Sequence, residues 1–195
     1  QGLHFKMMMK AEFFKYPKES LYNLMKERFE MTDDDFKDYA DDIGFDKVEL
    51  PNNPVKLAKK HIDAIKKIVG EENVSVSDYD RLCVAYGFTA YDILRLRHKR
   101  IDCVPDIVVY PSKTEQIEKI VAYVTENDIP LYVYGGGSSV TRGVEPVKGG
   151  ITLDMRKRFN KILSFNEIDQ TITVQAGMSG PKLEETLHSA PELFG

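Results

Sequence analysis

Tryptophan is absent from this sequence of 195 residues, and cysteine occurs only twice, at Cys83 and Cys103. Two cysteines at this spacing match neither a disulfide framework nor a CxxC metal or redox motif. Because disulfides are rare in reducing compartments, we expect the protein to be cytoplasmic. No run of about 18 apolar residues is present, which excludes a membrane-spanning helix. Residues 1–10 also lack the pattern of a secretory signal peptide.

An excess of positive charge is also missing. Lys and Arg number 27 against 31 Asp and Glu, so the net charge is −4 and the isoelectric point lies near 5.6. Domains that bind nucleic acid are usually basic, so this balance argues against nucleic acid as a partner. Hydrophobic residues make up 42% and charged residues 30% of the chain, as in ordinary folded proteins, which excludes wholesale disorder.

Patterns typical of metal sites and of catalytic side chains are missing as well. The four histidines, His4, His61, His98 and His188, lack the spacing of metal ligands. The acidic run that begins at Asp33 fails the EF-hand pattern and suits the first turn of a helix. No Ser-His-Asp or Cys-His arrangement can be justified. We therefore predict no metal site and assign no catalytic residue.

The spacing of apolar residues changes near residue 100. Before it the spacing is helical, and we predict helices over about 21–29, 57–69, 78–86 and 90–97, with one more that begins at Thr32. Ser77 or Asp78, and Thr89, are suitable N-caps, and Gly70 is a suitable helix end. The last of these helices closes with the basic residues Arg95, Arg97, His98, Lys99 and Arg100. They could attract a phosphate, but a solvated helix end explains them better.

Strands alternate with helices after Pro105. The run 107–110 is short and β-branched, which predicts a buried strand. A helix capped by Ser112 or Thr114 and a strand over 131–134 follow, so a βαβ unit with parallel strands is expected. Further strands are expected over 151–154, 162–165 and 171–175, with a helix over 179–189. The sequence thus predicts an α+β fold with a helical region 1–100 and a β-rich region 101–195.

The most informative stretch directly follows the strand over 131–134 and consists of Gly135, Gly136, Gly137, Ser138, Ser139, Val140 and Thr141. Glycines there allow a positive φ and the close approach of a ligand, and successive N–H groups can converge on an anion. This glycine loop is not a P-loop, because no Gly-Lys-Ser/Thr follows, and a GxGxxG fingerprint would need glycine at Val140. Taken alone, the glycine run is explained equally well by a turn without a ligand.

The surrounding segments favour a ligand. The order of 88–97, 105–111, 129–131, the glycine loop, 151–155 and 174–177 resembles the flavin-binding domain of the vanillyl-alcohol oxidase type, also called the FAD-linked oxidase N-terminal domain. Within that superfamily the chain is most similar to alkyldihydroxyacetonephosphate synthases and their bacterial relatives. The resemblance is strong over about 89–187 and weaker over 1–88.

The resemblance implies FAD as the cofactor. In the family the glycine loop wraps the FAD pyrophosphate, so residues 135–141, with Tyr134 at the strand end, are the expected contacts. Ser138 keeps the hydroxyl of the threonine that is usual in the family, whereas Val133 replaces a common proline. The middle glycine, Gly136, is expected to need a positive φ or to leave no room for a β-carbon beside the phosphates.

Family members extend well past the position of Gly195. By resemblance, residues 101–195 are the first half of an FAD-binding domain, and the chain is an N-terminal fragment that is inactive alone. The whole enzyme would oxidise a 2-hydroxy acid or a related substrate, or would exchange the acyl chain of acyl-dihydroxyacetone phosphate for a fatty alcohol. The expected partners are FAD and a small-molecule substrate, with a homodimer left open. The alternative is a catalytically inert fragment or a partner-binding module.

Overall fold

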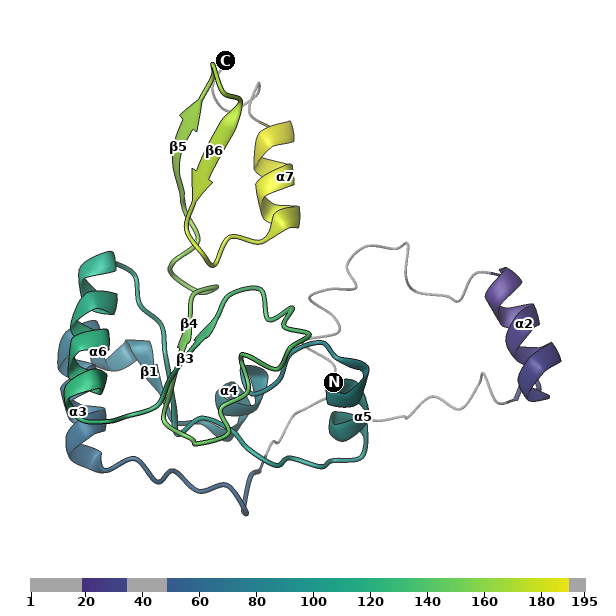
Figure 1. Ribbon diagram of the computed structural model, residues 1–195, viewed down its shortest axis with the longest axis horizontal. Helices are drawn as coiled ribbons and strands as arrows, with labels where there is room; N and C mark the ends of the chain where they lie inside the picture. Colours follow the sequence, from purple (N-terminus) through teal and green to yellow (C-terminus); the bar gives the residue numbers. More distant parts are fainter. Residues whose placement is uncertain (1–18, 35–48, 190–195) are drawn as a thin grey trace. The chain divides into compact units, whose positions relative to one another are not determined.

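The computed structural model describes residues 19–34 and 49–189 (Figure 1). Its contacts divide the chain into two units, Gln1–Val48 and Glu49–Gly195. In the described part of the first unit, helix α2 (Glu19–Phe29) buries none of its residues. The helix expected from Thr32 falls on residues 35–48, outside the described part of the chain.

The second unit is built on a four-stranded sheet with the order β1-β2-β4-β3. The strands are β1 (Val74–Ser75), β2 (Ile107–Val109), β3 (Leu131–Tyr134) and β4 (Ile151–Asp154). β2, β4 and β3 run parallel, and β1 pairs antiparallel with β2. The predicted strands of the βαβ unit are therefore parallel in one sheet, but β4 lies between them.

Both faces of this sheet are buried. On one face, α3 (Lys59–Val69) and α6 (Thr114–Glu126) pack together over the strands (Figure 1). Because side chains alternate along a strand, Ile107 and Val109 join the core under α3 and α6, whereas Val108 faces the opposite side. There it packs in a second buried cluster that also contains Val84, Tyr110 and Tyr134. Burial on both faces explains why β2 is continuously apolar and why every residue of β4 is buried.

Most predicted helix ends are confirmed. The Ser77 side chain accepts a hydrogen bond from the Asp80 N–H at the start of α4 (Asp78–Cys83), which is shorter than expected. Thr89 caps α5 (Ala90–Arg97) in a capping box with Asp92. Gly70, with φ of 95°, ends α3.

The predicted cap of α6 is wrong. Lys113 occupies the N-cap position without a side-chain hydrogen bond, and Thr114 is the first helical residue. The Ser112 N–H donates to the Gln116 side chain at 2.9 Å. The side-chain contact at this end of the helix therefore comes from Gln116 in the first turn and not from a capping serine or threonine.

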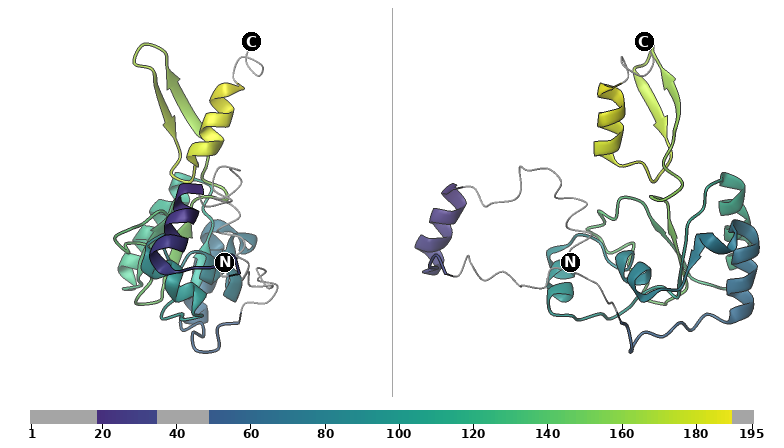
Figure 2. Two further views of the ribbon diagram at one scale, coloured as in Figure 1. Left: turned by 90° about the vertical axis from the view of Figure 1, so that its right-hand side faces the viewer. Right: turned by 180° about the vertical axis from the view of Figure 1, so that it is seen from behind.

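The chain after β4 forms an antiparallel hairpin of β5 (Ile162–Asn166) and β6 (Thr171–Val174), followed by α7 (Gly180–His188) with Ser179 as its N-cap. Figure 2 shows α7 running alongside this hairpin. The combination of helices, a mixed sheet and an antiparallel hairpin confirms the α+β class. The change near residue 100 does not coincide with the division of the contacts, because β1 and α3 pack in the same unit as the later strands.

Candidate ligand site at the glycine loop

The glycine loop begins where β3 ends, at the carboxyl edge of the parallel strands. Ligands of open α/β sheets bind outside this edge. Tyr134, the last residue of β3, is fully buried and lies against the loop: a β-carbon on Gly137 would lie 2.1 Å from its hydroxyl oxygen. Gly137 also has a φ of 71°, which L-residues rarely adopt. The loop therefore requires glycine at 137 for two independent reasons.

Gly136 lies on the open side of the loop. A β-carbon there would meet no atom within 4 Å, and Gly136 does not have a positive φ. The expectation of a positive φ at the middle glycine was wrong, because Gly137 takes up the left-handed turn above Tyr134. The other half of that expectation, a bare backbone beside the phosphates, stays a prediction.

The open side of the loop is exposed to solvent. Gly136, Ser138, Val140 and Thr141 are exposed, with 72% of Val140 accessible. The loop thus presents main chain and the hydroxyls of Ser138 and Thr141. Neutral donors of this kind can bind an anion without a side-chain cation.

Ser139 differs from the other hydroxyl residues, because it braces the loop from inside. Its hydroxyl accepts from the Gly143 N–H at 3.1 Å, and its carbonyl accepts from the Phe88 N–H at 3.2 Å. A β-carbon on Gly87 would lie 2.2 Å from that carbonyl oxygen. The turn at 87–88 therefore fixes the middle of the loop, which makes Gly87 a positioning residue that sequence reasoning missed.

The first glycine of the loop meets the turn that follows β6. A β-carbon on Gly135 would lie 3.2 Å from the carbonyl oxygen of Ala176. The next residue, Gly177, donates its N–H to the Phe159 carbonyl at 2.8 Å, and a β-carbon on it would lie 2.0 Å from the carbonyl oxygen of Met155. Gly177 is thereby fixed against the segment 155–159, and Ala176 lies close to the start of the loop.

An ion pair lies beside the loop at the end of β4. Asp154 accepts hydrogen bonds from Arg156 Nε at 2.9 Å and from its Nη2 at 2.7 Å. The guanidinium carbon lies 4.5 Å from the centre of the Tyr134 ring. Burial raises the pKa of the Tyr134 hydroxyl, so this ring is neutral at physiological pH. The carboxyl edge thus carries a fixed ion pair that sequence reasoning missed.

Arg95 contradicts the expectation of a solvated basic helix end. It is buried, pairs with Asp92 at 2.7 Å and with Glu145 at 2.8 Å, and its guanidinium carbon lies 4.2 Å from the centre of the Tyr86 ring. His98, Lys99 and Arg100 are exposed, as expected, and the side chain of Arg97 lies outside the description. The i, i+3 spacing of Asp92 and Arg95 was a usable signal for a pair, but nothing local indicated Glu145.

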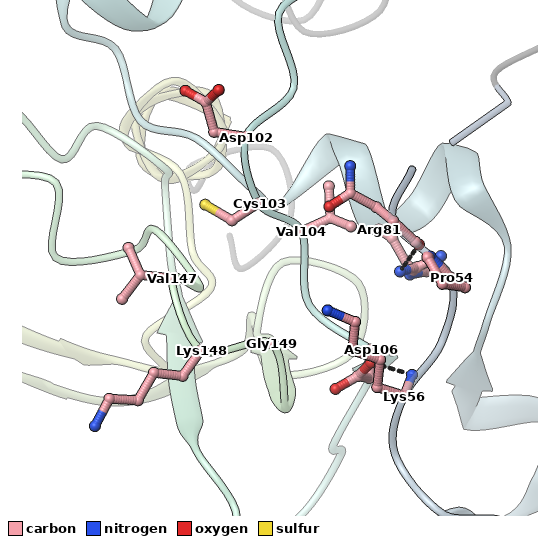
Figure 3. Close-up of a pocket in the computed structure, with 11 residues that line it drawn as sticks. Pro54, Lys56, Arg81, Asp102, Cys103, Val104, Asp106, Val147, Lys148 and Gly149 are labelled. Atoms are coloured by element: carbon pink, nitrogen blue, oxygen red, sulfur yellow. Dashed lines mark hydrogen bonds between the residues drawn. The ribbon is translucent and has the colours of Figure 1, made fainter. Parts of the chain in front are cut away.

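A pocket of about 270 Å³ lies at the opposite edge of the sheet, where β2 and β4 begin (Figure 3). Asp106 lines it, and this carboxylate accepts from the Lys56 N–H at 2.6 Å and from the Gly150 N–H at 2.7 Å. Arg81 donates to the carbonyl of Pro105 at 2.7 Å. These charges therefore hold backbone segments together, and the pocket is separate from the glycine loop.

Neither thiol is activated. Burial raises the pKa of Cys83, and burial together with the Glu145 carboxylate raises the pKa of Cys103 to about 12. A thiol with so high a pKa is a poor nucleophile at neutral pH. Within residues 19–34 and 49–189, no group of three His, Cys, Asp or Glu side chains is placed to hold a metal ion. In the same residues, no helix is long and apolar enough to cross a membrane.

Comparison with known proteins identifies the second half of the chain. Residues 105–195 match the family described as "FAD binding domain". The alkyldihydroxyacetonephosphate synthase of Dictyostelium discoideum is 27% identical over 139 residues, which are 70% of this chain and 23% of that protein. The D-lactate dehydrogenase [cytochrome] 1, mitochondrial, of Saccharomyces cerevisiae is 28% identical over 152 residues, or 77% and 25% of the two chains. The chain thus spans about a quarter of the length of these relatives.

Solved structures agree with the sequence relatives. A structure of alkyldihydroxyacetonephosphate synthase superposes with a TM-score of 0.67 and 25% identity, covering 75% of this chain and 27% of that one. The 4-ethylphenol oxidase of Gulosibacter chungangensis, 22% identical, shares the fold with a TM-score of 0.54 over 71% of this chain and 26% of its own. Residues 105–195 therefore belong to the FAD-linked oxidase family, with FAD as cofactor and a domain similar to that of the alkyldihydroxyacetonephosphate synthases.

Proposed function

We propose that the glycine loop binds the pyrophosphate of FAD in a longer flavoenzyme. The observation that carries this proposal is the open backbone at Gly136, where a β-carbon would meet no atom within 4 Å, at the carboxyl edge of the parallel strands. The residues present fit the group. The loop offers neutral donors to a charged pyrophosphate, and a side chain at 136 would fill the space that the phosphates need.

The chain's own residues bind and orient the cofactor. Tyr134 and the turn at 87–88 fix the loop, while Ser138 and Thr141 supply exposed hydroxyls. When bound, FAD supplies the redox or adduct-forming chemistry, and the protein supplies position and electrostatics. We assign no acid or base to the described residues.

The whole protein would carry out one of two reactions. In the first, the whole protein is an oxidoreductase that acts on a 2-hydroxy acid; among relatives named for such substrates is the glycolate oxidase subunit GlcD of Bacillus subtilis, which is 30% identical over 122 residues, or 63% of this chain and 24% of its own. In the second, it acts as an alkyldihydroxyacetonephosphate synthase. The first has a net redox change and the second has none, so one experiment separates them.

The experiment is anaerobic mixing of the purified whole protein with D-lactate, with glycolate, and with acyl-dihydroxyacetone phosphate plus a fatty alcohol. Lasting loss of the oxidised flavin absorbance with a hydroxy acid supports the oxidoreductase. Formation of the ether lipid without lasting flavin reduction supports the synthase. A colourless protein that does not take up FAD would instead support an inert fragment or a partner-binding module. A cytoplasmic location and a homodimer remain part of the proposal.

A further inference from the structure

We propose that Arg95, Glu145 and Arg142 form a clamp that fixes residues 142–145, which directly follow the glycine loop and are called its second limb below, and thereby holds the loop in the shape that binds FAD. Arg95 and Glu145 are then positioning residues for the cofactor. Arg95 lies outside residues 105–195, the segment that matches the FAD-binding family. The proposal rests on the proposed function of the loop as the pyrophosphate site.

The centre of the clamp is Glu145, whose side chain is only 4% exposed. Arg142 Nε donates to its Oε2 at 2.5 Å, and Arg142 Nη2 donates to its Oε1 at 2.9 Å. Arg95 Nη1 donates to the same Oε1 at 2.8 Å. One buried carboxylate thus joins the loop's second limb to a residue 50 positions earlier in the chain.

Arg95 is itself fixed, so it can serve as an anchor. It pairs with Asp92 at 2.7 Å, and Asp92 forms the capping box of α5 with Thr89. The Arg95 guanidinium carbon lies 4.2 Å from the Tyr86 ring centre and 4.7 Å from that of Tyr91. A shift of Glu145 away from Arg95 would leave the buried guanidinium of Arg95 with one partner fewer, which costs free energy. The clamp therefore has a defined position relative to α5.

Arg142 shows why the loop needs such a clamp. Its φ is 64°, in the left-handed region that favours glycine, and glycine follows only at 143. The Glu145 N–H donates to the Arg142 carbonyl at 3.1 Å, which closes a tight turn, and the Gly143 N–H donates to the Ser139 hydroxyl. The ion pairs of Arg142 with Glu145 stabilise this unfavourable conformation. The hydrogen bond between Gly143 and Ser139 connects it to the glycine loop.

The clamp acts through geometry and not by adding positive charge. Arg95 and Arg142 are balanced by the carboxylates of Asp92 and Glu145, and Asp102 lies 3.3 Å from Arg95 as well. Carboxylates of the protein therefore neutralise both guanidinium charges. If the clamp acts by holding the positive φ of Arg142, glycine at this position should make the ion pairs unnecessary, because glycine adopts a positive φ without strain. Another uncharged side chain should not do so.

The test compares Arg142→Met with Arg142→Gly in the whole protein, with the apoprotein titrated with FAD and binding followed by flavin fluorescence. Both variants lose the guanidinium, whose side chain is half-exposed, so both should fold. We expect Arg142→Met to weaken FAD binding about tenfold or more, because it keeps the strained φ without the ion pairs, and Arg142→Gly to stay close to wild type. Equal affinities for the two variants would overturn the proposal.

Glu145→Gln provides the second arm, with Glu167→Gln at an exposed carboxylate as its matched control. We expect Glu145→Gln to weaken FAD binding, Arg142→Gly to restore it in the double variant, and Glu167→Gln to have no effect. Failure of Arg142→Gly to restore binding would contradict the clamp. Gly136→Val separates the two proposals: if it binds FAD normally, the loop is not the site, whereas loss of FAD in Gly136→Val with normal binding in both Arg142→Met and Glu145→Gln refutes the clamp alone.

Discussion

The hydroxyl oxygen of Tyr134 lies 2.1 Å from the point where a β-carbon on Gly137 would stand. This relationship links the end of β3 to the left-handed residue of the glycine loop, since Gly137 has a φ of 71°. The tyrosine ring is fully buried, with the Arg156 guanidinium carbon 4.5 Å from its centre, and therefore cannot easily move away. Two neighbouring glycines thus differ, because the protein itself requires glycine at 137, whereas at 136 we propose that the ligand does.

Gly137→Ala is expected to destabilise the protein, whereas Gly136→Ala is not. Alanine at 137 must adopt a positive φ and displace a buried ring, at a cost of about 1–3 kcal/mol for the backbone alone. At 136 the added methyl group meets open space. Urea denaturation followed by circular dichroism measures the difference. Equal midpoints for the two variants would show that the loop adapts freely around Tyr134.

Gly136→Val is expected to abolish FAD binding and to leave the fold intact. A β-carbon at 136 meets no protein atom within 4 Å, so we expect the effect of the side chain to fall on the ligand. The strands Ile107–Val109 and Leu131–Tyr134 should be unaffected. The measurement is the flavin content of the purified whole protein beside its far-UV circular dichroism. A fully flavinated variant would show that the loop does not hold the pyrophosphate.

Ser138→Ala is the milder change at the same site. It removes one exposed hydroxyl, which contributes roughly 0.5–1.5 kcal/mol if it bonds a neutral acceptor and more if it bonds a phosphate. We expect weaker FAD binding without loss of the fold, measured by fluorescence titration. Ser139→Ala is the informative comparison, because that hydroxyl braces Gly143 and its removal should also lower stability. An unchanged affinity in Ser138→Ala would remove this residue from the site.

The parts of the fold that carry a local signal could be predicted from the sequence. Three consecutive glycines mark the loop, and Thr89 marks the start of α5, because turn and cap preferences act within a few residues. Strand β1, only two residues long, is too short to leave a pattern. The burial of Arg95 could not be predicted, because it depends on Glu145 at a distance of 50 residues in the chain. Which of the three glycines has the positive φ could not be predicted either, because three consecutive glycines give no local signal that separates Gly136 from Gly137.

The isolated chain of 195 residues is expected to bind FAD weakly or not at all. Affinity for a dinucleotide is the sum of many contacts, and the proposed pyrophosphate site would supply only some of them. The hairpin also exposes apolar side chains, with 60% of Leu163 and Phe165 and 94% of Ile168 accessible, which favours association of copies. Calorimetry with FAD and light scattering test both statements. Tight, stoichiometric binding by a monomer would contradict them.

Glu145 is expected to make the stability of the protein depend on pH in the acidic range. Burial alone would raise the pKa of this carboxyl, but hydrogen bonds from Arg142, Arg95 and Cys103 outweigh it and lower the pKa from 4.5 to about 2. A carboxyl with a depressed pKa stabilises the folded state fully above its unfolded pKa, and this contribution is lost as the pH falls from about 4.5 towards 2.

Urea denaturation of wild type and Glu145→Gln between pH 7 and pH 3 measures this contribution. Glu145→Gln should be less stable at pH 7, because it leaves Arg95 buried with one partner fewer, by on the order of 2–3 kcal/mol. The difference should shrink as the pH falls below about 4.5, because the carboxyl of the unfolded wild type then takes up a proton while that of the folded protein stays ionised, which favours unfolding. Glu167→Gln, at an exposed position, should follow the wild type at every pH. A difference between wild type and Glu145→Gln that stays constant across this range would show that the carboxylate charge is not what Arg95 and Arg142 hold.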